Sequence, residues 1–503
     1  MSPVVQIILA VCSGLALTAA FPTWDFHLIA WVALIPLLGV VAKVSPARGL
    51  GLGWCAGLVF FSTLLPWLTH TMTTYSTLSF PLALLVLFGL AATLGGYIGV
   101  FSWAQALVCR HLGPKGLLLA PVLWVAVEWG RGHLFTGFPW GLLGYSQYGE
   151  LRLIQIAAWT GVYGVSFLLV LINAAVALAC IQGWQGLRIG GAVTLIALTI
   201  AVSIGTWRLG RASVSDFPVV LVQGSIDQSV KWSPSFQRAT MDIYLGLTRE
   251  ARAAHPRLVV WPETAAPYFL SREPAVAAEI SSLAASIGAP IVVGAMEAEP
   301  GPASVTYFNS AFLVTASDGI AGRYDKMHLV PFGEYVPLKR LLFFVEAIAA
   351  EIGDFTPGAR PLVFDSGVRF GVVICYEGIF PELFREFVKG GAEFMVNITN
   401  DAWFGRTSGP IQHLTMLPFR AVENDVAVVR AANTGVSAII EPSGKIRERL
   451  GLFERGEVIG RIPLRKDATF YTRYGDAFAL ACLGTGGAVL AWVGWDRGRR
   501  REC

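Results

Sequence analysis

Long uncharged apolar stretches fill the first two hundred residues and return near the C-terminal end, separated by short polar segments. A helix needs about 20 mostly apolar residues to cross a bilayer, and most of these stretches approach that length. The pattern therefore predicts an α-helical multi-pass membrane domain with about eight spans. We place them at about 4–21, 26–43, 50–68, 80–108, 116–130, 152–181, 189–206 and 477–495, of which 116–130 is short.

A segment of mixed polarity, about 212–470, separates the seventh span from the eighth and is long enough for one sizeable folded domain. We therefore expect three parts: a membrane domain at 1–211 with seven spans, a folded domain at 212–470, and the eighth span with a basic tail at 471–503.

Short apolar strands alternate with helical stretches in the segment 212–470, which predicts an α/β domain whose sheet is covered by helices. Several strands end in polar residues, and α/β sites usually form at such sheet edges. The predicted strands are 258–263, 290–295, 370–375, 394–398, 426–430 and 437–441, and the predicted helices are 235–254, 273–287 and 381–389.

Composition and charge agree with a membrane protein. Hydrophobic residues make up 54% of the 503 residues and charged residues only 14%, against about 25% charged in soluble domains. The formal net charge of +4 is small, and basic residues collect in short segments between apolar runs. This arrangement indicates membrane orientation and gives no support for a nucleic-acid partner.

The loops that carry Lys and Arg predict the orientation, because such loops stay in the cytoplasm. We expect both termini to be cytoplasmic and the 212–470 domain to lie on the far side. No Lys or Arg precedes the first apolar run, so we interpret that run as a retained helix and not as a signal peptide. The basic residues behind the orientation are Lys43, Arg48, Arg110, Lys115, Arg188 and the cluster 497–501.

Cys375 is the candidate nucleophile. None of the seven cysteines forms a C-x-x-C pair, and Cys375 alone falls in the mixed-polarity domain. A thiol attacks a carbonyl as the thiolate, so its ordinary pKa of about 8.5 demands a base or a positive neighbour. An inert cysteine in a core strand would be the ordinary interpretation. However, Glu377 follows two residues later, and a core strand rarely continues into a carboxylate.

Glu263 and Lys326 are the candidate partners of the thiol. Glu263 ends an apolar strand, and a carboxylate held among apolar groups suits a general base. Lys326 opens a constrained loop rich in proline and aromatic residues, where its charge is suited to stabilise a tetrahedral intermediate. Taken singly, Glu263 is equally well explained as a helix-cap neighbour or surface residue, and Lys326 as a solvated surface lysine.

Other polar residues add little at this level. His255, His328 and His413 are not at metal-ligand spacing, so we interpret them as structural and predict no metal and no cofactor. Asn309 is a possible pocket residue that nothing in the sequence distinguishes from chance.

The order strand–Glu263, loop–Lys326, strand–Cys375 resembles the nitrilase superfamily, which has a Glu-Lys-Cys triad in an α-β-β-α sandwich. With flanking spans in a seven-plus-one arrangement, the chain is most similar to the apolipoprotein N-acyltransferase family within it. Supporting motifs are Gln223-Gly224, Lys231-Trp232, Pro331 to Pro337, Cys375-Tyr376-Glu377, Asn397 to Gly405 and, in the membrane part, Gly137 to Gly141.

The resemblance implies a ping-pong transfer through a Cys375 thioester, from a phospholipid such as phosphatidylethanolamine to the α-amine of a diacylglyceryl-cysteine on an apolipoprotein. Glu263 would be the base and Lys326 the oxyanion partner. It also implies the inner membrane of a bacterium, with the catalytic domain in the periplasm. The supporting residues it implies are Glu334 and Glu377 as positioning acids and Tyr376 and Trp232 as pocket residues.

Two alternatives stay open. A membrane-tethered nitrilase-type amidase or hydrolase would share the acyl-enzyme and use water as acceptor, and a transporter or scaffold would carry a passive domain. A further hypothesis concerns the apolar residues near 341–355, which we interpret as a mobile arm that dips into the lipid; a buried helix explains the same pattern equally well.

Overall fold

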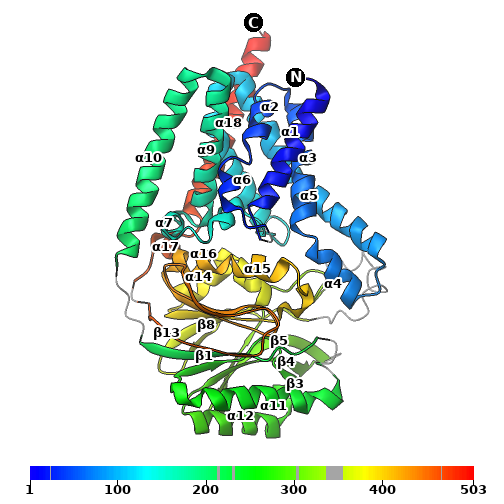
Figure 1. The fold of residues 1–503 in the computed structure, drawn as a ribbon, viewed down its shortest axis with the longest axis vertical. Coiled ribbons are helices and arrows are strands. Elements are labelled where there is room, and N and C mark those ends of the chain that lie inside the picture. The colour runs from blue at the N-terminus through cyan, green and yellow to red at the C-terminus, as the bar shows by residue number, and fades with distance from the viewer. Residues whose placement is uncertain are drawn as a thin grey trace. The chain divides into compact units, whose positions relative to one another are not determined.

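The computed structural model describes residues 1–22, 24–211, 216–228, 231, 233–301, 305–335, 355–465 and 467–502. Contacts within the chain divide it into two compact units. A helical unit comprises Met1–Thr69, Ser79–Arg211 and Tyr474–Cys503, and an α/β unit comprises His70–Leu78 and Ala212–Arg473. Each unit is described by itself (Figure 1).

The helical unit is built from long apolar helices that pack through small residues. A Cβ atom added to Gly57 of α3 would meet the Cα atom of Gly95 of α5 at 2.6 Å, so glycine at both positions lets the two backbones touch. The principal helices are α1 (Pro3–Ala19), α2 (Ile35–Val41), α3 (Pro46–Leu64), α5 (Phe80–Leu112), α6 (Ala120–His133), α9 (Val162–Gln182), α10 (Trp184–Leu209) and α18 (Ala477–Glu502).

Five helical stretches in the described chain are long and apolar enough to cross a membrane: Pro46–Leu64, Phe80–His133, Val162–Gln182, Trp184–Leu209 and Ala477–Asp496. The stretch Phe80–His133 contains two helices, α5 and α6, which are joined by the 3-10 turn Gly113–Leu119 and pack against each other. Pro3–Ala19 and His27–Val41 are shorter apolar helices. The membrane character is thus confirmed, whereas the number of eight spans stays a prediction.

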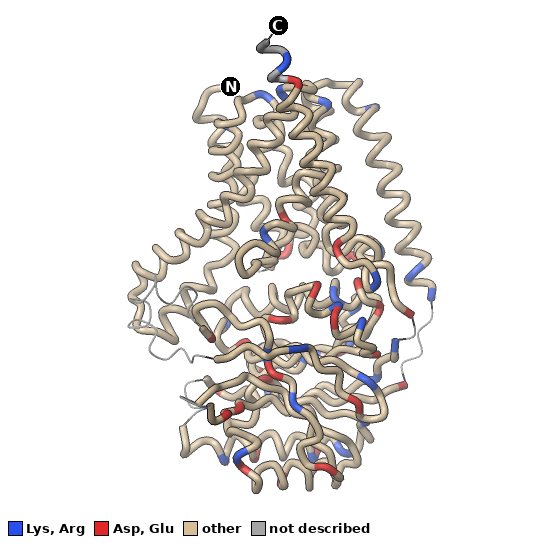
Figure 2. Tube along the Cα trace, turned by 180° about the vertical axis from the view of Figure 1, so that it is seen from behind, with Lys and Arg blue, Asp and Glu red and all other residues tan. Residues whose placement is uncertain are grey.

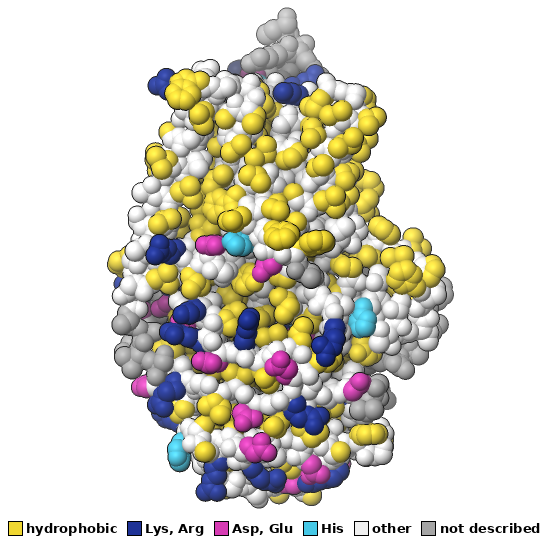
Figure 3. Space-filling model, in the orientation of Figure 1, with side chains coloured by type: hydrophobic (Ala, Val, Ile, Leu, Met, Phe, Trp, Pro, Cys, Tyr) yellow, Lys and Arg dark blue, Asp and Glu magenta, His cyan; other side chains and the backbone are white. Residues whose placement is uncertain are grey.

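The surface of the helical unit matches this reading. Hydrophobic side chains are spread over its visible face in Figure 3, and few positions along its long helices are coloured as charged residues in Figure 2. Several Lys and Arg residues gather at the end of the unit where both termini lie (Figure 2).

The α/β unit contains two sheets in its described part. One has the order β13-β1-β2-β4-β5-β6, with β3 paired to β4, and the other has the order β12-β11-β10-β9-β8-β7. The strands of the first are β1 (Phe217–Gln223), β2 (Leu258–Val260), β3 (Ala266–Phe269), β4 (Ile291–Pro300), β5 (Val305–Thr315), β6 (Gly319–Asp325) and β13 (Gly456–Ile462). Those of the second are β7 (Val363–Asp365), β8 (Arg369–Ile374), β9 (Phe394–Thr399), β10 (Ala427–Ala432), β11 (Ser437–Ile440) and β12 (Ile446–Leu450).

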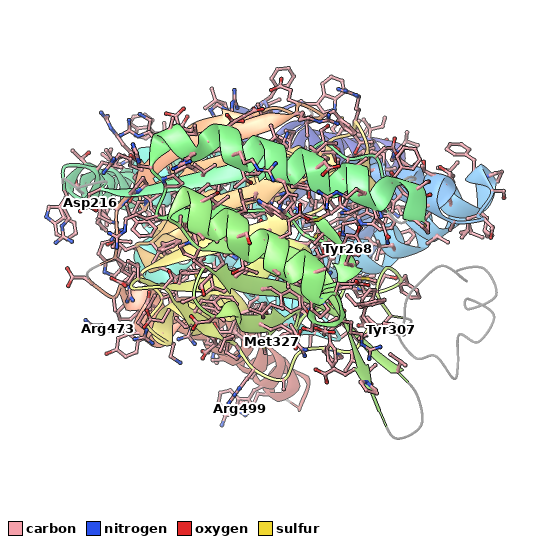
Figure 4. The ribbon with its side chains drawn as sticks, turned by 90° about the horizontal axis from the view of Figure 1, so that it is seen from below. Asp216, Tyr268, Tyr307, Met327, Arg473 and Arg499 are labelled. Carbon is pink, nitrogen blue, oxygen red and sulfur yellow. The ribbon has the colours of Figure 1, made fainter. Side chains whose placement is uncertain are left out.

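The two sheets pack face to face, and helices cover their outer faces. On β1, Val219 and Leu221 enter the core between the sheets, whereas Val220 and Val222 point to the helices, as the two-residue period of a strand requires. Helices α11 (Pro234–Glu250) and α12 (Pro274–Ile287) lie side by side over the first sheet (Figure 4). Helices α14 (Pro381–Lys389) and α16 (Leu417–Asn424) cover the second. The predicted α-β-β-α sandwich is confirmed.

The boundaries of the predicted elements differ in ways that affect the site. The strand expected at 258–263 ends at Val260, so Glu263 lies in the loop that follows it. The strand expected at 370–375 ends at Ile374, and Cys375 begins the short 3-10 helix η6 (Cys375–Ile379). Helix α14 has the predicted bounds.

Candidate active site

Cys375 lies at the turn from β8 into η6 and adopts a positive φ of 51°. A non-glycine residue in this region costs of order 1–3 kcal/mol, so the surrounding contacts must hold it there. The side chain is only 8% exposed. Burial raises the pKa of the thiol, the negative charge of Glu263 raises it further, and the positive charge of Lys326 opposes both. Cys375 is therefore held as a thiol and needs a base to react.

Glu263 follows β2 in a loop in which both of its carboxylate oxygens are fixed. Its Oε1 accepts a hydrogen bond from Asn309 Nδ2 at 2.7 Å, and its Oε2 accepts one from the backbone N–H of Asn400 at 2.7 Å. The residue is 5% exposed. The surface-residue interpretation of Glu263 is therefore wrong, and its carboxylate faces the interior of the α/β unit.

Lys326 follows β6 and is 1% exposed, so it is no solvated surface lysine. Its Nζ atom lies 2.9 Å from the Glu334 carboxylate and 3.5 Å from Oε1 of Glu263. Burial by itself would lower the pKa of Lys326, but the negative charges of Glu334 and Glu263 raise it above the usual value. The side chain is thus a fixed positive charge at neutral pH.

Asn309 of β5 joins the two carboxylates that flank Lys326. Its Nδ2 atom donates to Oε1 of Glu263 at 2.7 Å and to Oε1 of Glu334 at 2.8 Å. Glu334 also accepts the backbone N–H of Val330 at 2.8 Å. The sequence alone did not distinguish Asn309 from chance as a pocket residue, because one polar residue in a strand carries no signal of what it faces across the sheet. Its hydrogen bonds to Glu263 and Glu334 place it among the site residues.

Glu377 links the turn that contains Cys375 to the loop that follows Lys326. It is fully buried, and its Oε1 accepts from the backbone N–H groups of Met327 at 2.6 Å and His328 at 3.0 Å. The same oxygen accepts from Tyr324 Oη at 2.8 Å, and Oε2 accepts from Ile374 N–H at 2.7 Å. Burial raises the pKa of Glu377 to about 7 although these donors oppose the shift.

The remaining predicted site residues have different outcomes. Tyr376 is partly buried beside His328 and Phe380, with ring centroids 5.8 Å and 5.0 Å away. Trp232 and the apolar residues 341–354 lie outside the described residues. The structure therefore brings Glu263, Lys326, Cys375 and Glu377 into one buried set, with the partly exposed Glu334 beside Lys326.

Gly294 of β4 leaves the space in which the Glu263 loop runs. A Cβ atom at this position would lie 2.1 Å from the carbonyl oxygen of Pro262 and 2.7 Å from the Cα atom of Glu263. Gly294→Ala is expected to displace the loop and lower turnover about 100-fold, since a displacement near 1 Å can cost that much. The control Gly246→Ala, on α11 with no atom within 4 Å, should leave turnover unchanged. Equal turnover in both variants, measured as product per folded enzyme, would refute a fixed Glu263 loop.

Similarity to known proteins agrees with this geometry. The family model "Carbon-nitrogen hydrolase" matches residues 219–468, which defines the α/β unit as a member of that class. The model "Apolipoprotein N-acyltransferase N-terminal domain" matches residues 13–175. The chain belongs to the apolipoprotein N-acyltransferase family.

Relatives match over nearly the whole chain. The apolipoprotein N-acyltransferase of Geobacter metallireducens is 43% identical, covering 97% of this chain and 95% of its own length. Those of Brucella melitensis and Methylococcus capsulatus are 35% and 33% identical, covering 91% and 96% of this chain and 90% and 95% of their own lengths. Among solved structures, the nitrilase-superfamily protein Nit3 of Saccharomyces cerevisiae has 21% identity and a TM-score of 0.39, covering 50% of this chain and 92% of that one.

Proposed function

We propose that this chain is a membrane-bound N-acyltransferase that moves an acyl chain from a phospholipid, through a thioester on Cys375, to the α-amine of the N-terminal diacylglyceryl-cysteine of apolipoproteins. The observation that supports it most is the buried set of Glu263, Lys326 and Cys375 in a chain that also carries several membrane-spanning helices. The relatives are named apolipoprotein N-acyltransferases, which supports acyl transfer to apolipoproteins.

In the first half-reaction, the Glu263 carboxylate takes the thiol proton and Cys375 Sγ attacks the carbonyl carbon of the phospholipid sn-1 ester. The ammonium of Lys326 stabilises the oxyanion, because it is a fixed positive charge at low exposure. The C–O bond then breaks, and the leaving alkoxide takes the proton back from Glu263. The products are a lysophospholipid and the Cys375 thioester.

In the second half-reaction, the neutral α-amine of the acceptor attacks the thioester carbonyl. Glu263 takes a proton from the attacking nitrogen, the C–S bond breaks, and the thiolate of Cys375 recovers the proton as the amide forms. Glu334, bonded to Lys326 and linked to Glu263 through Asn309, holds the lysine in place through both steps. Glu377 keeps the turn that contains Cys375 beside the loop that follows Lys326.

We also propose that the protein lies in the inner membrane of a bacterium, with both termini in the cytoplasm and the α/β unit in the periplasm. The gathering of Lys and Arg at the terminal end of the helical unit supports this orientation. Phosphatidylethanolamine is the proposed donor.

Acceptor dependence tests this function against the hydrolase alternative. Purified full-length protein incubated with phosphatidylethanolamine vesicles alone should release about one lysophospholipid per enzyme and then stall. Adding a diacylglyceryl-cysteine peptide should restart release, with one N-acyl peptide formed per lysophospholipid. Continuous release of free fatty acid without the peptide would instead establish a hydrolase.

The apolar arm gives a separate prediction about lipid entry. The double substitution Phe343→Ser and Phe344→Ser should slow thioester formation from vesicle phospholipid, because the arm loses the apolar surface that would enter the lipid. The rate with a water-soluble short-chain thiophenyl ester should stay unchanged, as should the melting temperature. An unchanged rate of thioester formation from vesicles would contradict a role of these residues in lipid entry.

A further inference from the structure

A buried group of charged and polar residues lies next to the backbone of Cys375 and has no role in the two proposed half-reactions. It consists of Asp401, His413 and Arg430, whose exposed fractions are all 1% or less. Arg430 comes from β10, His413 from α15 (Gly409–Leu414), and Asp401 begins the short 3-10 helix η7 (Asp401–Phe404) that follows β9. Three separate elements thus meet at one point next to η6.

The contacts of His413 fix the orientation of its ring. Its Nε2 atom lies 3.1 Å from the carbonyl oxygen of Cys375, and a carbonyl can only accept, so Nε2 carries the proton. Burial lowers the pKa of His413 and the charge of Arg430 lowers it further, against the opposing charge of Asp401. Its Nδ1 atom lies 3.1 Å from Asp401 Oδ1 and 3.2 Å from Arg430 Nη2, so both residues fix the orientation of the ring.

Asp401 fixes the arginine that orients the histidine. Arg430 Nη2 donates to Asp401 Oδ2 at 2.6 Å, and Thr399 Oγ1 donates to Asp401 Oδ1 at 2.9 Å. Arg430 Nη1 donates to Asn397 Oδ1, and Asn397 Nδ2 is a second, longer donor to the Cys375 carbonyl at 3.4 Å. His413 and Asn397 thus both reach the backbone carbonyl of Cys375, and Asn397 Nδ2 also donates to the carbonyl of Val373 at 3.2 Å.

The direction of these contacts decides what the histidine does. An Asp–His pair beside a cysteine suggests a general base, but the described contact of Nε2 is with the carbonyl oxygen of Cys375 and not with its sulfur. Cys375 also holds a positive φ, a conformation that persists only where neighbouring contacts enforce it. A donor aimed at its carbonyl is such a contact.

We propose that His413, oriented by Asp401 and Arg430, is a positioning residue that holds the backbone turn of Cys375 in the conformation required for acyl transfer. The segment that contains Asp401 also contacts the proposed base, because the backbone N–H of the neighbouring Asn400 donates to the carboxylate of Glu263. This inference rests on the proposed role of Cys375 as the nucleophile.

The test uses the full-length chain in detergent, with the variants His413→Leu, His413→Gln and Asp401→Asn. Leucine removes the donor, whereas glutamine keeps an N–H group that can reach toward the carbonyl. The matched control is Glu423→Gln. Glu423 is also a fully buried carboxylate paired with a buried arginine, Arg420 at 2.7 Å, and none of its described contacts is with a member of the reacting set.

His413→Leu should lower the single-turnover rate constant of thioester formation about 100-fold, since misplacement near 1 Å costs this much, without changing the half-saturating phospholipid concentration. Asp401→Asn should lower it similarly, and His413→Gln should recover part of the loss. Glu423→Gln should lower the melting temperature and keep the rate within about twofold of the wild type. Variants of His413 and Asp401 that melt earlier but react at the control's rate would overturn the proposal.

A second measurement separates this inference from the proposed function. Iodoacetamide alkylation of Cys375, followed by peptide mass spectrometry, needs no acyl donor. If the wild type formed no thioester, the proposed function would fail, and alkylation would decide the inference alone. Alkylation of His413→Leu at a rate clearly different from that of the wild type and Glu423→Gln would support positioning, and equal rates would contradict it.

Discussion

Replacing Cys375 with alanine is expected to abolish both lysophospholipid release and N-acyl peptide formation. Cys375 is the one described cysteine in the α/β unit, and the charges of Glu263 and Lys326 both act on its thiol. Without the sulfur no thioester can form, and the loss should reach the background of the assay. Release of lysophospholipid from radiolabelled phosphatidylethanolamine measures it.

Two further variants make this result specific. Cys482→Ala removes a buried cysteine of α18 in the helical unit and should leave both products unchanged. Cys375→Ser keeps the position with a weaker nucleophile and should retain at most a trace of lysophospholipid release, with any adduct resisting neutral hydroxylamine as an ordinary ester does. N-acyl peptide formation by Cys375→Ala above background would require a different nucleophile.

Replacing Lys326 with methionine should have the second-largest effect. The change removes a buried ammonium that lies 2.9 Å from Glu334 and 3.5 Å from Glu263, and no other cation is bonded to these two carboxylates in the described contacts. Removing one oxyanion donor costs about 10²–10³ in kcat. Breaking a buried pair also costs about 3–5 kcal/mol of stability, part of which proton uptake by the carboxylates can relieve.

The same variant predicts a shift in the reactivity of Cys375. The charge of Lys326 lowers the pKa of the thiol, so its removal should raise that pKa and move iodoacetamide alkylation of Cys375 to higher pH. The control Lys389→Met removes a lysine of α14 that is 45% exposed and pairs with Glu386 at the surface, and it should change neither turnover nor the alkylation profile. A Lys326→Met profile that stays in place or moves to lower pH would contradict the assigned electrostatics.

Much of the fold was predictable from local pattern. Apolar runs of spanning length and short strands bounded by turns are sequence signals, and Pro381 to Lys389 formed the predicted helix because a proline begins it and a glycine follows it. Strands such as β6 and β12 were missed, since their residues are partly exposed and mix polar with apolar types. The span number could not be fixed, because α1 and α2 fall short of the usual length.

The site was predictable where each residue follows its own strand and belongs to a recognisable motif, as Glu263, Lys326 and Cys375 do. Asn309 and His413 escaped prediction for a physical reason. The partners of Asn309 lie 46 and 25 residues away, and His413 reaches a carbonyl 38 residues earlier only because α15 packs beside η6. Such contacts depend on how the elements pack, which a residue pattern along one chain does not contain.

The intact mass of the protein after exposure to phosphatidylethanolamine vesicles without acceptor tests whether Cys375 carries the acyl group. We expect one added acyl chain, located on Cys375 by peptide mapping and removed by neutral hydroxylamine. In Glu263→Gln the adduct should form at least 100-fold more slowly, since general-base catalysis contributes about 10²–10⁴-fold. An unmodified Cys375 in enzyme that is actively forming N-acyl peptide, or an adduct on Glu263→Gln at the wild-type rate, would contradict this expectation.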